Sequence, residues 1–172
     1  MGLIYLITII FSNIITASFS PLNLLGLIIP WGSVFVGATF VLRDICQEKY
    51  GRKNIYKLIF LAMVLSGIGS SILGDGLYVV IASCVAFLLS ETTDTEIYTR
   101  LKLPMHLRVM YSGIVGGALD SIVFVILGLS PLGAGMLPWN LVPNAIIGQI
   151  LFKTVMQFIG CYIIKKRNKG ID

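Results

Sequence analysis

Charged residues are scarce in this chain: Asp, Glu, Lys and Arg make up 12% of its 172 residues, against about a quarter in an average soluble domain. Hydrophobic residues make up 56%. A chain this short cannot bury so much apolar surface inside one soluble fold, and disorder requires the opposite composition. The composition therefore excludes a soluble globular protein and a disordered one, and it favours a small integral membrane protein.

Cysteine and histidine are also rare. The three cysteines, Cys46, Cys84 and Cys161, form no CxxC pair, and His106 is the only histidine. This argues against a disulfide framework and against a zinc site, so we expect no metal and no other cofactor. A cleavable signal peptide is not expected either, because residues 1–5 contain no basic residue and no small-residue cleavage site ends the first apolar run.

Apolar runs divide the chain into six segments, and a helix needs about 20 residues to cross a bilayer. We predict an all-α integral membrane protein with a single transmembrane domain over residues 1–172. Its six spans are predicted at about 3–19, 24–42, 57–73, 77–100, 108–127 and 141–164. Pro30 interrupts the second span and predicts a kink there. The segment 128–140 is uncharged and rich in Gly and Pro, and it forms either an external loop or a partly re-entrant one.

The basic residues alternate with the predicted spans. A polar loop over residues 43–56, which begins with Arg43, the loop after the fourth span and the C-terminal tail contain most of them. Together with Lys57 at the start of the third span, these segments hold twelve of the thirteen Lys and Arg residues. Basic loops mark the cytoplasmic side, so six spans place both termini in the cytoplasm. The net charge of +5 is then an orientation signal, and no nucleic-acid partner is expected.

Four ionisable residues lie within the predicted spans, where each is costly and usually faces a partner or a cavity. They are Glu91 and Asp94 in the fourth span, Asp120 in the fifth and Lys153 in the sixth. Asp120 and Lys153 lie at a similar depth in consecutive antiparallel spans. We therefore predict that these two residues form an ion pair.

Two amides lie at about the same depth as these charges. Asn13 is in the first span, and Gln149 is one helical turn from Lys153. Carboxylates, amides and one ammonium together predict a polar cavity that binds a small polar solute, such as a nucleobase. The alternatives are that the polar groups only join the helices, or that Glu91 and Asp94 are solvated at the level of the lipid headgroups.

Two motifs and a lysine resemble the VUT family of queuosine precursor transporters. The segment 44–51, DICQEKYG, matches that family's D-x-x-x-E-x-Y-G loop after an early span. Asp94 and Asp120 are each followed by two residues, a branched aliphatic and an aromatic, as in the family's two S-Q-x-x-D-x-x-(V/I)-F motifs. Lys153 resembles a lysine in the last span of that family.

The resemblance implies a transporter of the bacterial inner membrane that imports a 7-deazaguanine, typically 7-cyano-7-deazaguanine (preQ0), for queuosine synthesis. It also implies a six-span fold similar to the S-components of vitamin transporters. By position, it implies Asp94 and Asp120 in substrate binding, and Asp44 and Glu48 in the cytoplasmic loop or a gate. The sequence departs from the family motifs at Glu91, Gly116 and Gly117, where the family has Gln, Ser and Gln. The full candidate binding set is Asp94, Asp120, Lys153, Glu91, Gln149 and Asn13.

Two other functions remain open at this point. The chain could be the substrate-binding S-component of an ATP-driven vitamin or nucleobase uptake system. It has no G-x-x-x-x-G-K-(S/T) loop, so ATP would then be bound by partner ATPase subunits. A membrane enzyme is less favoured, because no G-x-S-x-G, HExxH or paired Cys/His motif is present. A homo-oligomer and an ATPase module are both compatible with the sequence.

Overall fold

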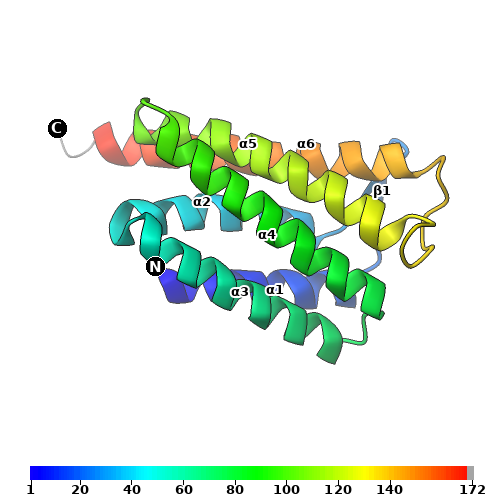
Figure 1. Cartoon of the computed structure of the whole chain (residues 1–172). Coiled ribbons are helices and arrows are strands. Elements are labelled where there is room, and N and C mark those ends of the chain that lie inside the picture. The colour runs from blue at the N-terminus through cyan, green and yellow to red at the C-terminus, as the bar shows by residue number, and fades with distance from the viewer. Residues whose placement is uncertain (170–172) are drawn as a thin grey trace.

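The computed structural model describes residues 1–169, and their side chains as far as residue 166. Six helices form a bundle in which consecutive helices run in opposite directions, and a short hairpin lies at one end (Figure 1). The helices are α1 Gly2–Ser18, α2 Gly32–Tyr50, α3 Arg52–Ile72, α4 Leu77–Arg100, α5 Met105–Phe124 and α6 Val142–Lys169. The strands are β1 Leu22–Leu24 and β2 Leu27–Ile29, and the short π-helix η1 Val125–Leu129 continues α5.

Four of the described helices are long and apolar enough to cross a membrane: α3, α4, α5 with its η1 extension, and α6. Helix α1 is apolar but has 17 residues, and α2 is polar in its C-terminal half. Large hydrophobic side chains such as Ile72, Leu77 and Tyr162 cover the outside of the bundle. A helical bundle with an apolar exterior is what the lipid core demands, so the chain is a helical multi-pass membrane protein.

The prediction for the second span is wrong in its first half. Residues 22–29 form an antiparallel hairpin, whose two-residue turn consists of Leu25 and Gly26 with positive φ values of 52° and 83°. Two consecutive residues with positive φ are typical of a type I′ hairpin turn. Helix α2 begins only at Gly32, so Pro30 lies before the helix and does not kink it.

The polar loop predicted for residues 43–56 is also wrong. Helix α2 continues to Tyr50, and α3 begins directly after a turn at Gly51, which has a φ of 79°. Asp44 and Glu48 therefore lie on α2 and not in a loop. The polar residues of this segment predicted exposure to water, but many of them face the interior of the bundle, where other helices supply their partners.

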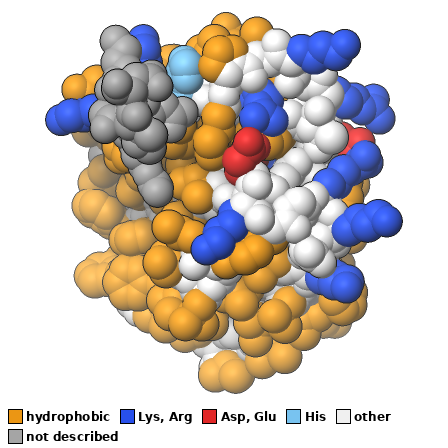
Figure 2. Space-filling view, turned by 90° about the vertical axis from the view of Figure 1, so that its left-hand side faces the viewer, with side chains coloured by type: hydrophobic (Ala, Val, Ile, Leu, Met, Phe, Trp, Pro, Cys, Tyr) orange, Lys and Arg blue, Asp and Glu red, His pale blue; other side chains and the backbone are white. Residues whose placement is uncertain are grey.

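One end of the bundle carries the basic residues and is called the basic end below. The start of α1, the α2–α3 turn, the α4–α5 connection and the last described residues of α6 meet there (Figure 1). Figure 2 shows this end with Lys and Arg side chains around its rim. Arg167 and Lys169 of the same predicted group lie outside the described side chains. The opposite end is called the hairpin end.

Three hydrophobic clusters hold the bundle together. One joins α1, α2 and α3 around Tyr5 and Ile55. A second joins α4, α5 and α6 around Tyr98 at the basic end, and a third lies around Val125 and Val142 at the hairpin end. Between these clusters, many of the side chains in the centre of the bundle are polar.

Candidate functional site

A cavity of about 270 Å³ lies inside the bundle and extends from its middle to the hairpin end. All six helices contribute to its wall. Two carboxylates, Asp75 and Asp120, one ammonium, Lys153, and two amides, Asn13 and Gln149, are part of the lining. Its hydroxyl-bearing lining residues are Ser12, Thr16, Ser33, Thr39, Ser66, Ser70 and Ser83.

Lys153 and Asp120 form an ion pair at the inner end of this cavity. Lys153 Nζ lies 2.6 Å from Asp120 Oδ2, which confirms the predicted pair. The ammonium also donates to Ser121 Oγ at 2.9 Å and to Gln149 Oε1 at 3.3 Å. Gly117 allows the close approach of α5 and α6 here, since a Cβ atom at this position would lie 3.3 Å from Lys153 Cβ. The pair is thus fixed by packing as well as by charge.

The amides of the cavity differ in how they are held. Asn13 Nδ2 donates to the carbonyl oxygen of Ser66 at 3.2 Å and to its hydroxyl at 2.9 Å, which ties α1 to α3. Gln149 is 3% exposed, and its Nε2 has no hydrogen-bond partner among the described residues. A buried donor without a partner is costly, so this amide is available to a solute.

Asp75 is a lining residue that the sequence does not single out. It follows Gly74 in the turn between α3 and α4, where a solvated turn residue is the simplest interpretation. Its carboxylate accepts a hydrogen bond from Ser70 Oγ, and both residues line the cavity. The turn therefore contributes an acidic group near the hairpin end of the cavity.

A second group of charges, called the Arg43 cluster, consists of Arg43, Asp44, Glu91 and Asp94. Arg43 lies 3.0 Å from Asp44 Oδ1 through Nη1 and 3.1 Å from Glu91 Oε2 through Nε, and its Nη2 contacts the Asp94 carboxylate. All four side chains are at most 1% exposed. Glu91 and Asp94 therefore do not line the described cavity, and the alternative that they are solvated is wrong, because both are buried.

Arg43 is the main residue of the site that the sequence does not reveal. It follows the apolar part of the second predicted span. The sequence therefore suggests a basic residue at the membrane surface that orients the chain. The guanidinium instead donates to Gln47 Oε1 at 2.9 Å and to Thr95 Oγ1 at 3.0 Å inside the bundle. The sequence feature that could have indicated a buried Arg43 is Gln47, one turn further on, because it places a second polar group on the same helical face.

The bundle is closed at the basic end by contacts to Glu48. This carboxylate accepts hydrogen bonds from Tyr98 Oη at 2.8 Å and from Arg108 Nη2 at 3.2 Å. The Arg108 guanidinium also lies 4.5 Å from the centre of the Tyr98 ring. These contacts join α2, α4 and α5 at the basic end.

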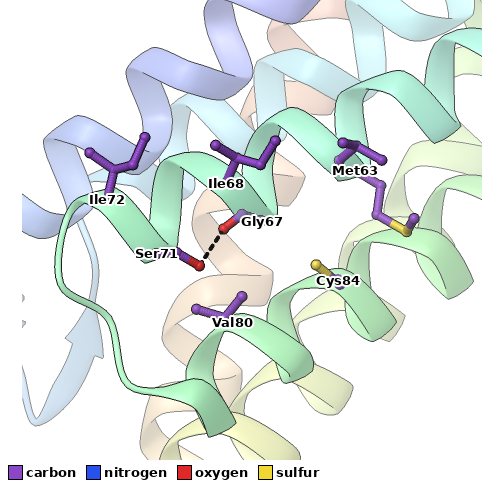
Figure 3. A pocket seen from close by; sticks show the side chains of 8 residues that line it. Met63, Gly67, Ile68, Ser71, Ile72, Val80 and Cys84 are labelled. Carbon is purple, nitrogen blue, oxygen red and sulfur yellow. Dashed lines mark hydrogen bonds between the residues drawn. The ribbon is translucent and has the colours of Figure 1, made fainter.

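An open groove of about 450 Å³ lies on the outer face between α3 and α4 (Figure 3). Its wall is mostly apolar, and the hydroxyl of Ser71 is already bonded to the carbonyl oxygen of Gly67 at 2.9 Å. The groove offers few groups that could recognise a polar solute. The interior cavity is therefore the better candidate for a solute-binding site.

A multi-pass helical bundle with a polar cavity in its interior has the architecture of a small-solute transporter. Residues 68–165 match a family described as "Putative vitamin uptake transporter". The match covers more than half of the chain, and the chain belongs to this family. The matched segment contains Glu91, Asp94, Asp120 and Lys153. No curated protein and no solved structure matches the chain.

Proposed function

We propose that the protein imports a queuosine precursor, a 7-deazaguanine such as 7-cyano-7-deazaguanine, through the interior cavity. The observation that carries this proposal is the Lys153–Asp120 pair beside Gln149 Nε2, which has no hydrogen-bond partner among the described residues. Membership of a vitamin uptake family supports the transport of a small nutrient. The resemblance to queuosine precursor transporters narrows that nutrient to a deazaguanine.

The chemistry of the cavity suits such a base. A carboxylate such as Asp120 can accept two hydrogen bonds from the N–H and NH₂ edge of a guanine-like ring, and the Gln149 amide can donate to its carbonyl oxygen. Lys153 can donate to a carbonyl or a cyano nitrogen. The volume of about 270 Å³ lies just below the roughly 300–1,000 Å³ of pockets for drug-sized ligands, as a small bicyclic base requires.

We further propose that all six helices span the cytoplasmic membrane of a bacterium, with the basic end and both termini in the cytoplasm. The cavity then opens outward, and the contacts of Glu48 close the path inward. Glu91, Asp94 and Asp44 lie between these two points. In this arrangement the precursor first binds at Asp120 and Lys153, and Glu91 and Asp94 meet it during its passage inward.

Complementation in bacteria that cannot make the deazaguanine tests the proposal. The protein should restore queuosine in tRNA when the external precursor is low, and Asp120→Asn or Lys153→Gln should abolish the rescue. Lys102→Gln is a matched control, because Lys102 is exposed at the basic end. Each variant is compared at equal abundance in the membrane. Failure of the wild type to restore queuosine with any deazaguanine would refute the substrate.

A further inference from the structure

The charges of the Arg43 cluster do not balance. Asp44, Glu91 and Asp94 surround one guanidinium, and no other cation forms an ion pair with them in the described part of the chain. Lys153 is bound to Asp120 instead. With every group ionised, one positive and three negative charges would give a net charge of −2, which one bound proton lowers to −1 and two bring to zero. Buried charges are costly unless they are paired, so the cluster requires a neutralising ligand.

The ligand that fits this cluster is a proton. Within the described residues, no set of His, Cys, Asp or Glu side chains is arranged to hold a metal ion. The guanidinium also occupies the centre of the cluster, where it would repel a second cation. A buried carboxyl can avoid an uncompensated charge by binding a proton. We propose that the Arg43 cluster is a proton-binding site, in which Glu91 gains and loses the proton during transport.

Two observations favour Glu91 as the carboxyl that binds the proton. Glu91 Oε1 and Asp94 Oδ1 both lack a partner in the described part of the chain, and the Glu91 contact to Arg43 is the longest of the three ion pairs. A second observation comes from α1. The Tyr5 hydroxyl faces the Glu91 carboxyl, is fully buried and makes no hydrogen bond of ordinary geometry within the described residues. A protonated Glu91 could form a hydrogen bond with this hydroxyl, so that both buried groups would gain a partner.

The surroundings of Glu91 connect it to the cavity. The titratable and charged groups that face it are Tyr5 on α1, Arg43 and Asp44 on α2, Asp94 on α4 and Asp120 on α5. Asp120 is in turn paired with Lys153 on α6, and Cys46 on α2 lies next to Tyr5.

One polar contact joins α4, next to Glu91, to the lining of the cavity. Ser90, the neighbour of Glu91 on α4, has its Oγ 3.4 Å from Asp120 Oδ1. Asp120 thus belongs both to the lining of the cavity and to the surroundings of Glu91. A base that binds at Asp120 would change the charge next to Glu91, and this part of the inference depends on the proposed function.

Infrared spectroscopy on the purified full chain in detergent, without any substrate, tests the proton site. The wild type should show the carbonyl band of a protonated carboxyl at neutral pH, and Glu91→Gln should weaken or remove it. Glu96→Gln should retain the band, because Glu96 is on the same helix but pairs with Arg52 at the basic end. Absence of the band in the wild type would refute the proton site, whatever the fold of the variants. A band of undiminished intensity in Glu91→Gln would refute the assignment to Glu91.

Uptake of 7-cyano-7-deazaguanine into vesicles that contain the protein tests the coupling. An inward proton gradient should raise the initial rate severalfold for the wild type and for Glu96→Gln, and it should leave the rate of Glu91→Gln unchanged. Equal wild-type rates with and without the gradient would refute the coupling. If the wild type transports no deazaguanine at all, the proposed function fails, while the infrared band still decides the proton site.

Discussion

Lys153 on α6 and Asp120 on α5 lie 2.6 Å apart at the inner end of the cavity, although 33 residues separate them in the chain. Each is the principal ionic partner of the other in the described structure, because Arg43 is engaged by its own three carboxylates. The pair compensates two charges inside the bundle, and in the proposed function it also offers a donor and an acceptor to the solute.

Asp120→Asn should abolish uptake and also destabilise the protein. It leaves the ammonium of Lys153, which is 2% exposed, without its counter-ion, and a broken buried pair costs about 3–5 kcal/mol. The double variant with Lys153→Gln should recover much of the melting temperature in detergent, because both charges are removed, but it should not recover uptake. Recovery of uptake in the double variant would show that the pair is structural only.

Gly116→Ala should lower the melting temperature and the yield of folded protein. A Cβ atom at this position would lie 2.9 Å from Asp94 Cβ, so α4 and α5 would have to separate next to the Arg43 cluster. Overpacking of this kind costs about 1–3 kcal/mol. Gly69→Ala is the matched control, because its nearest neighbour would be Asn13 Nδ2 at 3.8 Å, an ordinary contact. Equal melting temperatures for the two variants would contradict the close approach of the helices.

Most helices could be predicted from the sequence, because long apolar runs reveal a membrane helix without knowledge of its neighbours. Helices α3 to α6 lie close to the ranges expected from hydropathy. The Lys153–Asp120 pair could be predicted too, because consecutive antiparallel helices bring residues of equal depth together. Both inferences need only the local sequence and the direction of the chain.

Helix α2 could not be placed correctly for the same reason. Its C-terminal half is polar, and its burial depends on Glu91 and Asp94, which come from α4 far along the chain. Hydropathy therefore assigns Arg43 to a loop. The hairpin was not predicted because its residues are apolar and continue the hydrophobic run of the second span, although Gly26 between Pro21 and Pro30 is a turn signal. Tertiary partners, which a single sequence does not display, decide these two segments.

Tyr98→Phe should loosen the basic end of the bundle. It removes the hydrogen bond to Glu48 at 2.8 Å but keeps the ring that packs against Arg108. The loss of about 1 kcal/mol should raise the equilibrium population of the locally open state roughly fivefold. Hydrogen–deuterium exchange of the C-terminal halves of α2 and α4 measures this opening. Tyr111→Phe is the control, since Tyr111 is 48% exposed on the outer face, and identical exchange in both variants would contradict a closing role for Tyr98.

Arg43→Gln should reduce the abundance of the protein in the membrane and abolish uptake. The substitution leaves three buried carboxyls without their cation, which is far more costly than the loss of an exposed ion pair. Arg52→Gln is the matched control, because Arg52 is half exposed where it pairs with Glu96. A second substitution, Asp94→Asn, should partly restore the abundance of Arg43→Gln by removing one uncompensated carboxyl. If Arg43→Gln were as abundant and as stable as Arg52→Gln, Arg43 could not be the group that neutralises the cluster.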